Sequence, residues 1–239
     1  MEILSTEQAS ALLSDTSKQK KQSCEVLATE GKKFSASFQL KKLEQFNFSH
    51  TKQLGVRVID EGREGIAYTE NFTKDSLLDT FEKATLNAKA IRPEVITELA
   101  KSTKAPGMPE LFDARLTEIS VEEKLAAAQS IEIGATQVDP RIKSCPYNGY
   151  ADNDTTVHIW SSEGVAGSYR ANGCYAYSYA LAQQGDETTM APYVRMGKVP
   201  SDLKTSDIGK ISAEYALKRL GAIQPKSGSY PIVLSDKAA

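Results

Sequence analysis

The sequence predicts an α+β fold in which antiparallel sheets carry flanking helices. Runs of alternating apolar and polar residues, typical of strands with one buried face, occur in both halves of the chain. Four further segments repeat apolar residues at steps of three and four, which is typical of amphipathic helices. Short turns join consecutive strand runs, which favours antiparallel pairing. We expect two subdomains followed by the first strand of a C-terminal domain that is missing from this sequence.

The first predicted domain spans residues 1–105 and opens with a helix. Ser5 and Gln8 have the spacing of a capping box, and apolar residues follow them at helical steps. Strands are then expected at residues 24–29, 34–40 and 43–48. Residues 30–32, Glu-Gly-Lys, are expected to turn the chain between the first two of these strands.

Residues 54–91 read as strand, turn, strand and helix. The alternation from Leu54 to Ile59 indicates a strand with one buried face, and it resumes at Ile66. Between them, Gly62 and Gly65 supply positions where a positive φ is expected. A helix capped by Thr73 follows, with these apolar residues at steps of four and three: Leu77, Phe81, Ala84, Ala88 and Ile91.

The second predicted domain spans residues 106–224. Residues 104–109, Lys-Ala-Pro-Gly-Met-Pro, are incompatible with regular structure and mark the boundary. A capping box at Ser120 predicts a helix, residues 142–194 read as strands and turns, and Ser206 begins a last helix. Residues 225–239 are expected to form a linker and, from Tyr230 to Leu234, an apolar strand whose partner would belong to the missing domain.

Composition excludes several classes of function. The formal net charge of −2 gives no electrostatic support to nucleic-acid binding. The three cysteines lie far apart without a C-x-x-C pair, which favours reduced thiols over a disulfide framework. We find no secretory signal and no apolar run long enough for a membrane span. The sequence therefore predicts a soluble, cytoplasmic protein.

Residues that would carry metal or acid–base chemistry are scarce. The two histidines are His50, in an expected polar turn, and His158, in an expected strand; neither belongs to a zinc-binding motif. Asp152 and Asp154 fall in an expected turn, where aspartates commonly bond their own backbone. We therefore predict no catalytic residue and no metal ligand in this chain.

The most suggestive candidate for binding is a run of tyrosines. A period of two places Tyr175, Tyr177 and Tyr179 on one face of a strand, with small residues on the other. Such a stripe is either the wall of a groove for an extended peptide or a set of cross-strand packing contacts. Arg57, on the alternating strand at residues 54–59, is a fourth candidate for contact with substrate.

The order and spacing of several short blocks resemble the N-terminal half of the TldD/PmbA family, known as modulators of DNA gyrase or peptide-maturation proteases. No block is specific alone, and together they cover nearly all of the chain. The blocks are Leu54–Val58 with Gly62 and Gly65, the helix reaching Ala84, Ala88 and Ala90, Asp139–Ile142, Ser161–Gly164, the Ile208–Leu220 helix and the Tyr230–Leu234 strand.

This resemblance implies a zinc metallopeptidase family that acts on small or unfolded peptides and forms homo- or heterodimers. The family's metal motif, H-E-x-x-x-H with a distant cysteine, lies in the C-terminal domain, and no position here matches it. Zinc is therefore expected in the missing domain if the parent protein is a catalytic subunit. A non-catalytic peptide-binding or scaffolding partner subunit is the alternative, and a DNA- or gyrase-interacting role is a more distant one.

Overall fold

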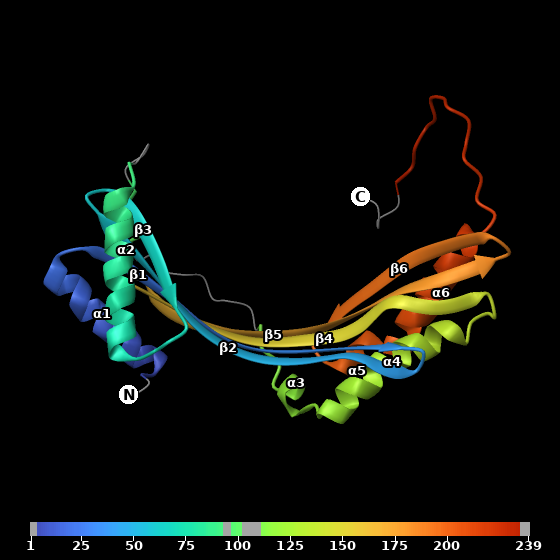
Figure 1. Cartoon of the computed structure of the whole chain (residues 1–239), viewed down its shortest axis with the longest axis horizontal. Coiled ribbons are helices and arrows are strands. Elements are labelled where there is room, and N and C mark those ends of the chain that lie inside the picture. The colour runs from blue at the N-terminus through green and yellow to red at the C-terminus, as the bar shows by residue number, and fades with distance from the viewer. Residues whose placement is uncertain (1–3, 93–96, 102–110, 235–239) are drawn as a thin grey trace.

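The computed structural model describes residues 4–92, 97–101 and 111–234, and its centre is one six-stranded antiparallel sheet (Figure 1). The strand order is β3-β2-β1-β4-β5-β6. Because β1 pairs with β4, the strands of the two predicted domains join in a single sheet. The strands are β1 Ser23–Gln39, β2 Lys42–Asp60, β3 Arg63–Thr69, β4 Ile142–Ser161, β5 Ala166–Gln184 and β6 Glu187–Gly197.

Three of the four predicted helices begin after their predicted N-caps, Ser5, Thr73 and Ser120, although the Thr73 hydroxyl makes no capping bond. The last helix begins at Thr205, after Lys204, so the cap predicted at Ser206 is wrong. Both predicted capping boxes form, with the hydroxyls of Ser5 and Ser120 accepting from the backbone N–H groups of Gln8 and Glu123. Together with the antiparallel sheet, these flanking helices confirm the predicted α+β class. The helices are α1 Thr6–Lys20, α2 Lys74–Ala90, α3 Arg115–Glu118, α4 Val121–Thr136, α5 Pro200–Leu203 and α6 Thr205–Arg219.

The helices cover only one face of the sheet, which curves along its length (Figure 1). Val26 and Ala28 of β1 pack under α1 and α2, whereas Phe34 and Ala36 of the same strand pack under α4 and α6. All four residues have even numbers, so both helical groups lie on the same side of β1. The opposite side, which we call the open face, is concave and carries the odd-numbered residues of β1 and β5, of β2 from Gln45 onward and of β4 from Tyr147 onward.

Three predicted turns are wrong because the strands run through them. Residues 24–29 and 34–40, predicted as separate strands, belong to the continuous strand β1, and Gly31 pairs with both Thr51 and Thr155. Asp152 and Asp154 lie within β4, and His50 lies within β2. These segments are polar because they cross the middle of the sheet, between the two helical groups, where both faces remain partly exposed to water.

The two glycines of the β2–β3 hairpin have different roles. Gly62 has a φ of 77°, as predicted, whereas Gly65 lies in β3 with an ordinary φ. A Cβ on Gly65 would lie 2.0 Å from the backbone oxygen of Ala84 and 2.2 Å from the backbone nitrogen of Ala88. Gly65 is therefore required by the close approach of α2 to the sheet.

The last described residues lie outside the sheet. Residues 222–234 follow α6 without regular secondary structure, and the strand predicted from Tyr230 to Leu234, whose partner would belong to a further domain, stays a prediction. Ile232 and Val233 are 79% and 96% exposed. An extended apolar segment forms a strand only beside a hydrogen-bonding neighbour, and no described strand lies beside this one. The predicted domain boundary and the irregular residues 104–109 fall outside the described residues.

Candidate functional site

The tyrosine stripe lies on the open face of β5. Tyr175, Tyr177 and Tyr179 alternate with buried Ala176 and Ser178, so the three rings share the helix-free side of the sheet. β5 lies between β4 and β6, so its backbone is hydrogen-bonded on both sides. The stripe therefore offers side chains to a ligand, while the free backbone edge on that side of the sheet belongs to β6.

The tyrosine rings pack against one another and against the sheet. The Tyr175 and Tyr177 rings stack with centroids 6.3 Å apart, and Tyr179 meets Tyr147 edge-on at 6.1 Å. Gly149 of β4 leaves room for Tyr177, since a Cβ there would lie 3.2 Å from the tyrosine hydroxyl. Both readings of the stripe thus have support, because the rings pack together and Tyr175 and Tyr179 still remain 43% and 37% exposed.

Burial tunes one hydroxyl of this stripe. Burial raises the pKa of Tyr177 above its ordinary value, and the neighbouring Tyr175 and Tyr179 raise it further. Tyr177 therefore stays protonated at neutral pH and can donate a hydrogen bond to a carbonyl or carboxylate oxygen.

A pocket of about 420 Å³ opens beside Tyr175 on the same face. Its rim consists mainly of odd-numbered residues from four adjacent strands, which the pairing register brings level with one another. Most of these are short polar side chains, and the sequence analysis did not identify them. They are Lys33, Ser35, Asn47, Ser49, Ala151 and Asn153, and the even-numbered Phe34 and Asp152 complete the lining.

The fourth predicted contact residue, Arg57, lies on the open face but far from the tyrosines. Arg57 pairs with Glu25 of β1. Tyr175 lies level with Ser35 of β1, and Ser35 is ten positions from Glu25 along that strand. At about 3.3 Å per residue, the separation is about 33 Å. The Arg57 guanidinium also lies 2.7 Å from Glu64 and 3.5 Å from Glu25, so its charge is already compensated. The structure brings the three tyrosines together and leaves Arg57 apart.

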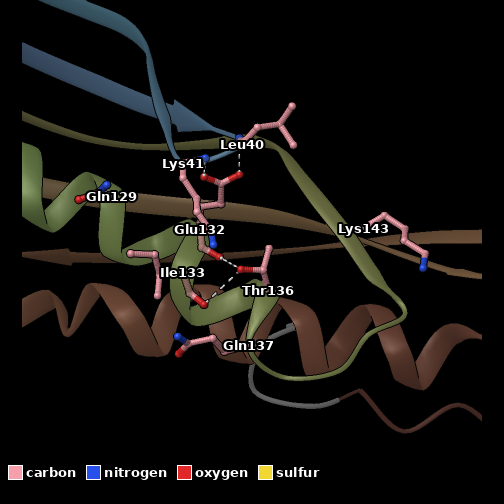
Figure 2. Close-up of a pocket in the computed structure, with 8 residues that line it drawn as sticks. All are labelled: Leu40, Lys41, Gln129, Glu132, Ile133, Thr136, Gln137 and Lys143. Atoms are coloured by element: carbon pink, nitrogen blue, oxygen red, sulfur yellow. Dashed lines mark hydrogen bonds between the residues drawn. The ribbon is translucent and has the colours of Figure 1, made fainter.

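A larger hollow, of about 560 Å³, lies beside α4 and has a structural explanation (Figure 2). Buried Glu132 points from α4 to the β1–β2 turn, where its two carboxylate oxygens accept from the backbone N–H groups of Leu40 at 2.7 Å and Lys41 at 2.8 Å. Both turn residues have positive φ, 51° and 62°. Glu132 therefore holds a two-residue turn that contains no glycine.

The described residues do not fit a catalytic metal. They contain no group of three or more His, Cys, Asp or Glu side chains that could hold an ion. His50 contacts Glu30 at 2.9 Å, and His158 lies on β4 with β1 between the two histidines. Asp152 pairs with Lys124 and Asp154 with Arg170, which leaves neither aspartate free as a ligand. We derive no chemical step through zinc from these residues.

The cysteines are unsuited to nucleophilic chemistry. Cys24, Cys145 and Cys174 are all free and buried. Burial raises the pKa of Cys24 to about 12, of Cys145 to about 11 and of Cys174 to about 12. At neutral pH all three therefore remain thiols, which are poor nucleophiles.

None of the helices in the described ranges is long and apolar enough to cross a bilayer.

Two family models match the chain. Residues 24–88 match PmbA/TldA metallopeptidase domain 1, and residues 114–220 match the PmbA/TldA metallopeptidase central domain. Curated relatives include the metalloprotease PmbA of Escherichia coli O157:H7, 22% identical over 92% of this chain and 49% of the relative. A PmbA homolog of Haemophilus influenzae is 30% identical over 62% of this chain and 33% of the relative. These matches define the class of protein: the chain carries the first and the central domain of a metallopeptidase family.

Solved structures share the fold. A proposed modulator of a DNA gyrase from Thermotoga maritima superposes with a TM-score of 0.84 at 21% identity, over 94% of this chain and 50% of that one. TldE from Thermococcus kodakarensis gives 0.79 at 16%, over 87% and 47%. This chain belongs to the PmbA/TldD family. It spans about half the length of the first curated relative that it matches.

Proposed function

We propose that this chain is the substrate-enclosing part of a PmbA/TldD-type metallopeptidase, which holds small or unfolded peptides while a zinc site outside the described residues hydrolyses them. The open face carries this proposal: it is concave, free of helices, and lined by three aligned tyrosines beside a polar pocket. Aromatic rings offer contact area with little loss of side-chain entropy, which suits the binding of varied extended peptides.

A peptide-binding titration tests the role of the tyrosines. Fluorescence anisotropy of a labelled, unstructured decapeptide is measured with the wild-type chain and with Tyr175→Ser and Tyr179→Ser. We expect each variant to weaken binding about fivefold, since an aromatic contact contributes about 1 kcal/mol. Tyr68→Ser is the matched control, because Tyr68 is 72% exposed on β3, outside the stripe. Equal losses in all three variants, or no binding to the wild type, would refute the proposal.

A non-catalytic peptide-binding or scaffolding partner subunit is the second candidate. Both candidates use the open face in the same way and differ in what accompanies it. An H-E-x-x-x-H motif downstream of residue 239 in the gene favours the catalytic subunit. A long downstream coding sequence without that motif favours the partner subunit. In either case we propose a homo- or heterodimer with a family member, which light scattering of the co-expressed proteins tests.

A further inference from the structure

One lysine stands apart among the charges of the open face. Along the strands that the structure describes, this face carries Glu25, Arg57 and Glu64 at one end and Glu44, hydrogen-bonded to Ser37, towards the other. Lys33 is the only charged side chain between them, and it faces no described ion-pair partner. It lies eight residues from Glu25 on β1, about 26 Å at the rise of a strand. Screening at physiological salt isolates charges beyond about 8 Å, so the charges at that end do not compensate the ammonium. Asp152 and Asp154, which line a neighbouring pocket together with Lys33, are already paired with Lys124 and Arg170.

The pocket beside Lys33 is rich in hydrogen-bond donors. Ser35 and Ser49 contribute hydroxyls, and Asn47 and Asn153 contribute amides. These side chains make no hydrogen bond to another described residue, so their donors remain available. Tyr175 closes the side of the pocket nearest to the stripe. Asp152 is the one carboxylate of the lining; it belongs to the helix-covered side of β4, where Lys124 pairs with it at 2.9 Å. A site that combines one unpaired cation with several neutral donors is suited to a small oxyanion.

Resting on the proposed function, we infer that this pocket binds a carboxylate of the peptide that lies on the tyrosine stripe. The carboxylate accepts from the Lys33 ammonium and from the surrounding hydroxyls and amides, and the adjoining peptide residues lie against Tyr175. The site thereby fixes the position of the bound peptide relative to the stripe. An α-carboxylate at the peptide C-terminus and the side chain of an acidic residue supply the same group, and the choice of peptides separates them.

Calorimetric titration of the full chain with three acetylated tetrapeptides tests this inference. The probes are Ala-Ala-Phe-Ala as free acid, the same peptide as C-terminal amide, and Ala-Glu-Phe-Ala amide. We expect a charged peptide to bind about fivefold tighter than the neutral amide, because an exposed charge pair contributes up to about 1 kcal/mol. A preference for the free acid assigns the site to the C-terminus, and a preference for the glutamate peptide assigns it to the side chain.

Two neighbouring lysines provide the variant and its control. Lys33→Met is expected to remove the preference, Lys33→Arg to restore it, and Lys32→Met to leave it unchanged, because Lys32 lies on the opposite, helix-covered side of β1. Equal affinity of the wild type for all three peptides overturns the carboxylate site and leaves the proposed function intact. A preference that survives in Lys33→Met also overturns it. If no tetrapeptide binds, the peptide-holding role of the open face fails first.

Discussion

Replacing Glu132 with alanine should destabilise the protein through the β1–β2 turn. The substitution removes both acceptors for the Leu40 and Lys41 N–H groups, at 2.7 and 2.8 Å. A hydrogen bond to a charged group contributes about 1.5 to 3 kcal/mol, and the adjoining hollow lets water reach the freed donors, so the lower value applies to each. We therefore expect the free energy of unfolding to fall by about 3 kcal/mol, measured by urea denaturation.

The turn geometry provides a second check on this reasoning. Both turn residues have left-handed backbone conformations, which cost a non-glycine residue about 1 kcal/mol. Adding Lys41→Gly to Glu132→Ala should therefore recover about 1 kcal/mol. Gln129→Ala is the matched control, because Gln129 lines the same hollow one turn earlier on α4. A loss below about 0.5 kcal/mol for Glu132→Ala, the range of ordinary surface substitutions, would refute the role of Glu132 in holding the turn.

Three further predictions follow from the described contacts. Gly65→Ala should cost about 3 kcal/mol in urea unfolding because its Cβ would overlap the backbone of α2, whereas Gly167→Ala, with open space around it, should cost little. A hydrogen bond from Arg141 lowers the pKa of Asp139 from 3.8 to about 2. The ionised carboxylate therefore stabilises the fold above about pH 4, and this effect is lost as the pH falls through 2. NMR titration of Arg141→Met should show the pKa of Asp139 returning towards 3.8. The three buried thiols should resist Ellman's reagent at pH 8 until urea unfolds the chain, and rapid labelling of the native protein would contradict their burial.

Local chemistry made much of the fold predictable from sequence. The capping boxes at Ser5 and Ser120 identify helix starts because the hydroxyl and the third residue bond each other's backbone within one turn. The alternation of side chains with a period of two correctly placed the three tyrosines on one face of a strand. Signals of this kind depend on neighbours in sequence and can be read without the rest of the structure.

The features that sequence missed depend on distant pairing. The continuity of β1 through Gly31 was not apparent, because polar residues in a sheet exposed on both faces resemble a turn. The pocket needs β2, β1, β4 and β5 in register, and the β1–β4 pairing joins residues more than a hundred positions apart. The buried carboxylate of Glu132 likewise gains its partners only from a turn that lies 91 and 92 residues away in sequence.

A spin-labelled, unstructured peptide tests most directly whether the open face holds peptides. Titrated into the isotope-labelled chain, it should broaden the NMR signals of the Tyr175, Tyr177 and Tyr179 rings far more than the methyl signal of Ala128, which α4 buries behind the same part of the sheet. Broadening that is centred on the helices, with the three rings unaffected, would contradict peptide binding at the open face.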